Sequence, residues 1–311
     1  PDVIAHFDTL KLEQLADHEV RVSGCRGSSP PSTHKVCINT KGKYKSGIEV
    51  LLTGLNIERK AELYIDQIFY NLGGQAQFDE VEIQLIRSDK ENPETNEEAH
   101  AALRITCSSS DPKKVNRLFS AKITELSLAT IPGNTSRGNS MGGGNETIVY
   151  WPALLDSQKV TEFLHLDGKT TEVLPTQRLG LEEKYYQEVP VEIAPAPSGP
   201  TVKAPLGSLF GARSGDKGGC ANCGVWAKTD EAYSFLHSFL TVDRFKELCP
   251  DVSQYQVLRY ELANMRSLNF YIKGILKDGV SSNNRIDGQA KSFGEYLRAK
   301  VIDIPQELFG A

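Results

Sequence analysis

Long apolar runs and an excess of positive charge are both missing from this chain of 311 residues. No run approaches the 18 apolar residues of a membrane-spanning helix, and the first residues, PDVIAHFDTL, lack the basic and apolar regions of a signal peptide. We therefore expect a cytoplasmic protein without a membrane partner. The net charge of -5 gives no basic face for nucleic acid, so we expect no partner of that class.

Cysteine is also sparse, which disfavours a disulfide framework and fits reduced thiols buried as small core residues. The six cysteines are Cys25, Cys37, Cys107, Cys220, Cys223 and Cys249. Cys220 and Cys223 form a Cys-x-x-Cys motif, but no second such motif or His pair stands at zinc-finger spacing, so we predict no metal and no cofactor. If Cys223 lies in a strand, the two sulfurs point to opposite faces. A redox motif of thioredoxin type would precede a helix, whereas a strand follows here.

Proline marks the sharpest change of composition, in the stretch VPVEIAPAPSGPTVKAP at 189–205. Five prolines favour extended backbone and resist both helix and central strand. We predict a larger domain over residues 1–188, a linker over 189–205 and a smaller domain over 206–311.

The first half of the chain has the pattern of an α+β layer. Residues 18–24, 34–40 and 47–54 are typical of short strands. The spacing of Ile57, Ala61, Ile65 and Ile68 predicts a helix that Asn56 caps and the glycines at 73–74 end. Alternation over 79–87 and 101–107 predicts two neighbouring strands, joined by a solvated acidic loop, and a second helix begins at Asp111 and Pro112.

A glycine-rich segment over 131–155 follows. Its backbone amides could approach a phosphate or carboxylate closely, or the segment is a surface loop. The glycine spacing fits neither the Walker pattern nor a dinucleotide fingerprint, which favours the surface loop.

The last hundred residues predict a small sheet with helices on one side, similar to a ferredoxin-like sandwich. The expected strands are 205–213, 221–228, 255–262 and 268–276. Helix is expected over 230–249, with Thr241 capping its continuation, and again over 291–299. The predicted fold class is therefore α+β, with a larger α/β domain followed by a small ferredoxin-like α/β sandwich.

The stretch RSGDKGG at 213–219 is the main candidate site, interpreted as a loop between the first two of these strands. The fork of Arg213, the point charge of Lys217 and the glycine amides suit a carboxylate or phosphate. Asp216 would order the turn or transfer a proton. The alternative is a structural turn in which Arg213 forms a salt bridge, and these residues alone do not decide between the two.

A second polar group is conceivable around Glu261, Asn264 and Arg266. These residues would lie beside the 213–219 stretch if their strands are adjacent to it. The simpler alternative is that such charges only form ion pairs.

Several motifs lie in the two predicted domains of the chain. The last hundred residues contain LGSLFGARSGDKGGCANCGVWAK, followed by LTVDRF, YELANMRSLNF and RIDGQAKSFGEYL. Upstream lie PDVIAHFDTLKLEQL, GIEVLLTG and IPGNTSRGNSMGGGNETIVYWPALL. The first set resembles the C-terminal domain of the acyclic terpene utilisation AtuA family, and the second resembles the later part of that family's large core domain.

The resemblance implies a set of site residues. Matching positions of the first motif are Arg213, Ser214, Gly215, Asp216, Lys217, Gly218 and Asn222, and those of the second are Asn264 and Asn269. Cys220 and Cys223 depart from the family pattern, which further weakens the thiol interpretations. DGQAKS departs from an expected D-x-x-G-K arrangement, so a role for Asp287 does not carry over.

Breakdown of citronellol-like and geraniol-like terpenes through coenzyme A thioesters is the pathway that the resemblance implies. We expect a small anionic substrate, such as a CoA thioester or branched acid, with hydratase or lyase chemistry as the class that the pathway favours. The resemblance also implies a long N-terminal region before the point where this chain begins on Pro1. We therefore expect a fragment of a longer protein or a subunit that needs an N-terminal partner chain. Separately, we expect a homo-oligomer.

Three hypotheses follow. The first is a protein acting on acyl-CoA or branched-acid intermediates, in which Arg213 and Lys217 hold the anion and Asp216 moves a proton. The second is a non-catalytic binding or assembly subunit of a carboxylase or another multi-component enzyme. The third is that the 213–219 stretch only ties the sheet together.

Overall fold

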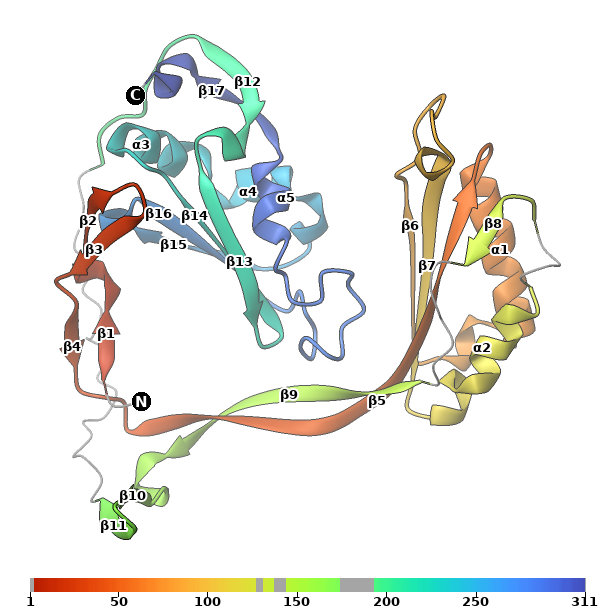
Figure 1. The fold of residues 1–311 in the computed structure, drawn as a ribbon, viewed down its shortest axis with the longest axis horizontal. Helices are drawn as coiled ribbons and strands as arrows, with labels where there is room; N and C mark the ends of the chain where they lie inside the picture. Colours follow the sequence, from red (N-terminus) through yellow and green to blue (C-terminus); the bar gives the residue numbers. More distant parts are fainter. Residues whose placement is uncertain (1–2, 127–130, 137–143, 174–192, 311) are drawn as a thin grey trace. The chain divides into compact units, whose positions relative to one another are not determined.

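A computed structural model describes residues 3–126, 131–136, 144–173 and 193–310. The chain forms two compact units, one of Pro1–Ile38 with Tyr150–Ala311 and one of Asn39–Val149. Two strands, β5 (Thr33–Thr53) and β9 (Asn145–Asp156), pair with each other (Figure 1). Each of them begins in one unit and ends in the other. The predicted domain boundary over 189–205 stays a prediction, and its residues 189–192 lie outside the described ones.

In the Asn39–Val149 unit, an antiparallel sheet has one face covered by two helices (Figure 1). The strand order is β6 (Glu80–Ile86), β7 (His100–Ser109), β5 and β8 (Asn134–Ser136). The helices are α1 (Ile57–Asn71) and α2 (Arg117–Thr124). The predicted pairing of the strands around 79–87 and 101–107 is confirmed, because β6 and β7 are in register from Glu80 and Ser108 onward.

The predicted helix over 56–72 is confirmed, but its predicted cap is wrong. Ile57, Ala61 and Ile68 are buried against the sheet, as their spacing requires. Asn56 adopts a left-handed conformation (φ 56°) and its side chain makes no capping hydrogen bond. The helix ends before Gly73, whose φ of +81° favours glycine.

The two strands predicted over 34–40 and 47–54 are a single strand, β5. Gly42, which stands between the two predicted ranges, lies within this strand. A β-carbon on Gly42 would come within 2.5 Å of the Thr147 hydroxyl oxygen, so the glycine allows β9 to approach closely and does not make a turn.

The predicted second helix starts as expected but is shorter and irregular. The Asp111 carboxylate accepts a hydrogen bond from the Lys113 amide at 2.9 Å. The first turn is a 3-10 helix, η4 (Pro112–Val115), and α2 begins only at Arg117. In the glycine-rich segment, residues 137–143 lie outside the described ones, and Asn134–Ser136 pair with β5 instead of forming a loop.

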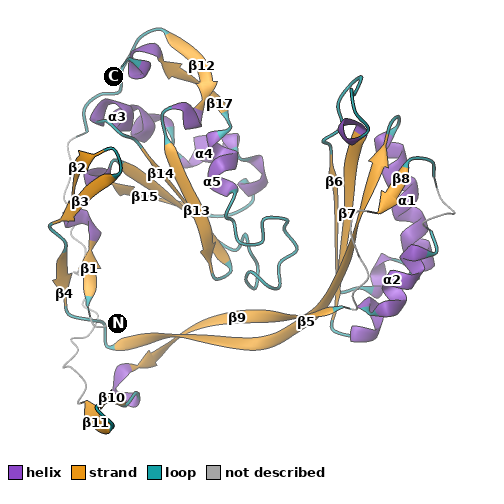
Figure 2. Ribbon diagram, in the orientation of Figure 1, coloured by secondary structure: helices purple, strands orange, loops and turns teal. Residues whose placement is uncertain are grey.

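The described residues of the other unit form, among other elements, four antiparallel two-stranded sheets; Figure 2 shows their strands in orange. Their pairs are β1 (Ile4–His6) with β4 (Arg26–Ser28), β2 (Lys11–Ala16) with β3 (Glu19–Ser23), β10 (Glu162–Leu166) with β11 (Lys169–Val173), and β12 (Thr201–Pro205) with β17 (Val301–Pro305).

The same unit holds the four-stranded sheet that positions the candidate site. Its strand order is β13 (Gly211–Lys217), β14 (Cys220–Trp226), β16 (Ser267–Ile272) and β15 (Val257–Leu262), all antiparallel. The helices are α3 (Asp230–Phe239), α4 (Val242–Leu248) and α5 (Phe293–Arg298). Thr241 caps α4 as predicted, since its hydroxyl accepts from the Arg244 amide at 3.1 Å.

Alternation along the strands separates an apolar face from a polar one. Cys223, Val225, Leu268 and Phe270 are fully buried and form one core with residues of the helices. The rings of Phe245 in α4 and Phe270 in β16 stack with centroids 4.3 Å apart. Burial of each such large side chain contributes about 1.5–3 kcal/mol. The intervening residues therefore occupy the face away from the helices.

Candidate functional site

The stretch from Arg213 to Lys217 is a strand, and its interpretation as a loop was wrong. Gly211–Lys217 pair with Cys220–Trp226 over their whole length, so that only Gly218 and Gly219 form the turn. Gly218 has a φ of +64°, and a β-carbon on Gly219 would come within 2.1 Å of the Lys277 carbonyl oxygen. A Gly-Gly pair between two runs that contain apolar residues is typical of a β-hairpin turn, so the sequence could have predicted this hairpin.

The register brings five of the sequence-predicted residues onto one surface. Gly215 lies opposite Asn222, and Gly224, opposite Arg213, lies in turn opposite Asn269 in the next strand. Residues paired across antiparallel strands point to the same side. We call this surface the polar sheet face; its residues are Arg213, Gly215, Lys217, Asn222 and Asn269.

Three cations surround Gly215 on this face. Arg213 and Lys217 flank it along β13, and the ammonium of Lys291 comes within 3.6 Å of the point that a β-carbon on Gly215 would occupy. Lys217 donates to the backbone carbonyl of Asp216 at 2.8 Å. Within the part of the chain that the structure describes, no carboxylate forms an ion pair with any of the three cations. Sequence reasoning missed Lys291, because it follows β13 by more than seventy residues.

Two amides continue the polar sheet face toward the middle of the sheet. Asn222 donates from its side chain to the Asn269 side-chain oxygen at 3.0 Å. One amide proton of Asn222 and both amide protons of Asn269 make no hydrogen bond to another described residue and are left for a ligand. Nothing within 4 Å covers the β-carbon position of Gly224 except the Arg213 carbonyl oxygen, 3.7 Å away, so the row from Arg213 to Asn269 has no side chain at its centre.

Ser214 and Asp216 do not join this group, because they alternate to the helix-covered side of β13. The Ser214 hydroxyl is buried and accepts a hydrogen bond from the Gly294 amide at 2.8 Å, near the start of α5. The structure therefore separates Asp216, the predicted proton-transfer group, from Arg213 and Lys217.

Asn264 also lies apart from the polar sheet face. It stands in the turn η8 (Ala263–Met265), and its side chain donates to the carbonyl oxygens of Phe7 at 2.8 Å and Leu10 at 3.1 Å. Its observed role is to hold the N-terminal segment against the turn.

Glu261 and Arg266 form ion pairs, as the simpler alternative predicted, although with partners other than each other. Glu261 lies 3.0 Å from His237 Nε2 and 3.3 Å from the Arg259 guanidinium, while Arg266 pairs with Asp230. β15 is at the opposite edge of the sheet from β13, so these residues do not lie beside Arg213 and Lys217.

The two sulfurs of the Cys-x-x-Cys motif point to opposite faces, as predicted. Cys223 is buried, and its burial, with a further contribution from Cys249, raises the pKa of its thiol to about 12. Cys220 lies on the other side, where its hydrogen bond to Tyr271, together with burial, raises the pKa of that phenol to about 12. Among the described side chains, no group of three or more His, Cys, Asp or Glu is arranged to hold a metal ion.

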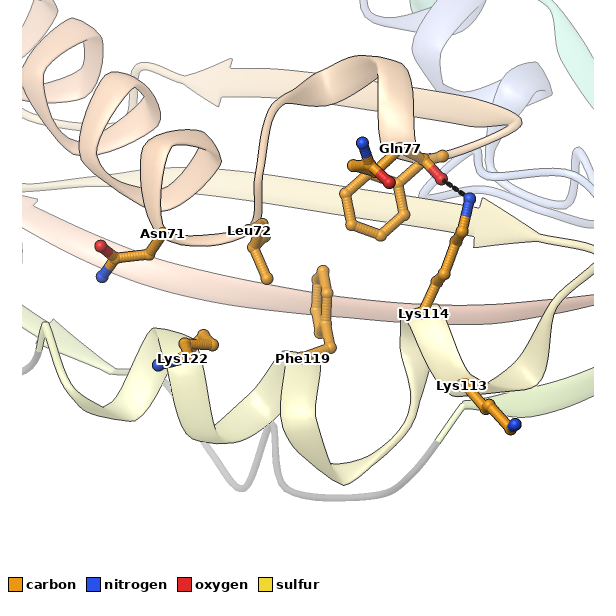
Figure 3. Close-up of a pocket in the computed structure, with 8 residues that line it drawn as sticks. Asn71, Leu72, Gln77, Lys113, Lys114, Phe119 and Lys122 are labelled. Carbon is orange, nitrogen blue, oxygen red and sulfur yellow. Dashed lines mark hydrogen bonds between the residues drawn. The ribbon is translucent and has the colours of Figure 1, made fainter.

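A cavity in the Asn39–Val149 unit has three lysines in its lining but does not concentrate their charge (Figure 3). Its volume is about 190 Å³, over a floor that includes Leu72 and Phe119. Lys114 donates to the Gln77 carbonyl at 2.8 Å, Lys122 pairs with Glu125, and Lys113 points away from Phe119. We therefore do not place the anion site there.

The fold and the site together define an α+β protein with a polar, cationic sheet face. A family model described as acyclic terpene utilisation family protein AtuA matches residues 1–166, and a model of the AtuA ferredoxin-like domain matches 204–303.

The chain therefore belongs to the acyclic terpene utilisation AtuA family, and the four-stranded sheet lies in its ferredoxin-like domain. This confirms the resemblance and the predicted fold class. We found no similar curated protein and no similar solved structure. In the described residues, no helix combines the length and apolar character needed to cross a membrane.

Proposed function

We propose that this protein binds an acyl-CoA or branched-acid intermediate of acyclic terpene breakdown on the polar sheet face. Arg213, Lys217 and Lys291 hold the anionic group around Gly215. The family is associated with acyclic terpene utilisation, and the acyl thioester is our addition to that association.

The observation that carries the proposal is the lack of carboxylate partners for these three cations in the described residues. The three side chains are exposed, and Lys217 bonds only to the Asp216 carbonyl, so a bound anion could accept charge-assisted hydrogen bonds from them, each contributing about 1.5–3 kcal/mol. Gly215 itself is buried, and the Lys291 ammonium lies beside it, so the anion would contact the three side chains above the glycine.

The two amides extend the site toward a second part of the ligand. Neighbouring strands are about 4.8 Å apart, which places Asn222 about one strand spacing and Asn269 about two from β13. A ligand whose anionic group sits at Arg213 can therefore direct a carbonyl oxygen to an amide proton of Asn222 or Asn269. Hydration or lyase chemistry remains the reaction class that we infer from the pathway.

A second candidate, a binding or assembly subunit, is supported by two exposed hairpins. Leu12 and Val22 of the β2–β3 hairpin and Phe163 and Leu166 of the β10–β11 hairpin are exposed. A two-stranded sheet with exposed apolar side chains is marginally stable alone, so a partner chain or a second copy would stabilise it.

Calorimetry with an R213A/K217A double variant separates the hypotheses. The matched control is R26A/K228A, which removes one arginine and one lysine, both exposed, outside the polar sheet face. Binding of isovaleryl-CoA should fall at least about tenfold in the double variant only, with unchanged melting temperature and oligomer size.

Other outcomes refute the proposal. Altered oligomer size without an effect on the ligand supports the assembly subunit, whereas a lower melting temperature alone supports a purely structural hairpin. Unchanged affinity of the double variant contradicts the anion site directly.

A further inference from the structure

A second cavity lies in the unit that contains the four-stranded sheet. It has a volume of about 620 Å³ and lies between Ile4–Asp8 and the hairpin of β15, η8 and β16. This volume is within the range of about 300–1000 Å³ that is typical of small-molecule sites. Of the polar sheet face, only Asn269 lines the cavity, and none of the three cations around Gly215 does.

Two aromatic rings in the lining are unusually exposed. Phe7 is 57% exposed and Tyr260 is 51% exposed, although both border the same cavity. Aromatic faces carry a negative potential and attract organic cations within about 6 Å. The pair therefore provides apolar surface that is also suited to positive charge.

The charged side chains of the lining also favour a positively charged ligand. Asp8 and Glu261 contribute two carboxylates, and Arg259 is the one arginine or lysine among the lining residues that the structure describes. Its Nη2 donates to the His237 carbonyl at 2.9 Å and lies 3.3 Å from Glu261, whereas its Nε is buried without a hydrogen-bond partner among the described residues. Asp8 also lies 4.0 Å from His6 Nδ1, and Glu261 3.0 Å from His237 Nε2. Counting Asp8, Glu261 and Arg259 alone, the lining carries a net negative formal charge.

One hydrogen-bond donor of the lining, the Asn264 amide, is already bonded to the protein backbone. The Asn264 amide nitrogen donates to two backbone carbonyls of the N-terminal segment, which leaves its side-chain oxygen as an acceptor. Asp8, Glu261 and the Asn264 oxygen are acceptors, whereas the Asn269 amide nitrogen and the Tyr260 hydroxyl can donate. The two carboxylates disfavour a carboxylate or phosphate as ligand and favour a ligand group that is positively charged and donates.

We propose that the 620 Å³ cavity binds an organic ammonium group, with Phe7 and Tyr260 against its alkyl part and Asp8 and Glu261 toward its charge. The ammonium belongs either to a small amine or to a lysine side chain of a partner. This site shares Asn269 with the polar sheet face, where Tyr260 lies opposite it in the next strand, but it includes none of the three cations around Gly215.

Three probes of equal chain length test the proposal on the full chain: n-hexylammonium, 1-hexanol and hexanoate, titrated by ligand-observed NMR at pH 7. We expect hexylammonium to bind at least about tenfold more tightly than the other two. Y260A and D8N should each weaken that binding at least about threefold. The controls Y70A and D66N replace exposed residues outside the cavity and should leave it unchanged.

A short peptide with one lysine, and the same peptide acetylated on that lysine, distinguish the two sources. Binding of the unmodified peptide and loss on acetylation indicate a partner's side chain, whereas binding of hexylammonium alone indicates a small amine. Equal binding of hexylammonium and hexanol, or unchanged affinity in both Y260A and D8N, overturns the proposal.

Discussion

The hydroxyl of Ser214 accepts a hydrogen bond from the backbone amide of Gly294 at 2.8 Å, and this bond joins β13 to α5. It fixes the edge strand whose other side carries Arg213 and Lys217. Ser214, which the resemblance placed among the site residues, therefore holds the strand that carries the site, while its own side chain lies on the opposite side of that strand.

Replacing Ser214 by alanine should lower the free energy of unfolding by about 1–3 kcal/mol, because the Gly294 amide would remain buried without a partner. Urea denaturation measures this change, with the exposed Ser208→Ala as control. An unfolding free energy equal to that of the control would show that the bond does not stabilise the fold.

Gly219→Ala should destabilise the hairpin more strongly than a typical surface substitution. A β-carbon there would overlap the Lys277 carbonyl oxygen at 2.1 Å, so the backbone must shift. Gly199→Ala is the matched control, since nothing lies within 4 Å of its β-carbon position. Equal melting temperatures of the two variants would contradict the turn geometry.

Stability should decline above about pH 9, because burial raises the pKa of the Cys107 and Cys223 thiols to about 12. A folded-state pKa above the unfolded one stabilises fully below the unfolded value of about 8.5, and that stabilisation is lost as pH rises toward 12. The loss is at most about 1.4 kcal/mol per pH unit for each thiol. Urea midpoints between pH 8 and 11 measure it, and C107A/C223A should reduce the dependence. A dependence unchanged in that variant would refute the assignment.

Asn264→Ala should free the N-terminal segment without unfolding the sheet. The variant removes both side-chain bonds to the carbonyls of Phe7 and Leu10. Hydrogen exchange of residues 4–10 should accelerate, whereas exchange in β14 and β16 should not change. Unaltered exchange over 4–10 would show that other contacts hold the segment.

Local patterns predicted most elements of the fold. The spacing of Ile57, Ala61 and Ile68 predicted α1, and Thr241 predicted the start of α4, because these signals act within one or two helical turns. Failures came where a distant segment decides the structure. Gly42 lies in a continuous strand because β9 packs against it, and this contact spans about a hundred residues.

The candidate site shows the same division. Arg213 and Lys217 were found because they share one short motif. That Asp216 faces the other side depends on strand alternation, which the Gly218–Gly219 turn would have revealed. Lys291 reaches Gly215 through tertiary packing alone, and no local pattern marks such a residue.

The most direct measurement of the central claim is a titration of the isotope-labelled protein with isovaleryl-CoA, followed by amide NMR shifts. The account predicts that the largest changes fall on the backbone amides of Gly215 and Gly224 and on the side-chain amides of Asn222 and Asn269. Shifts confined to other parts of the chain, or none at saturating ligand, would contradict it.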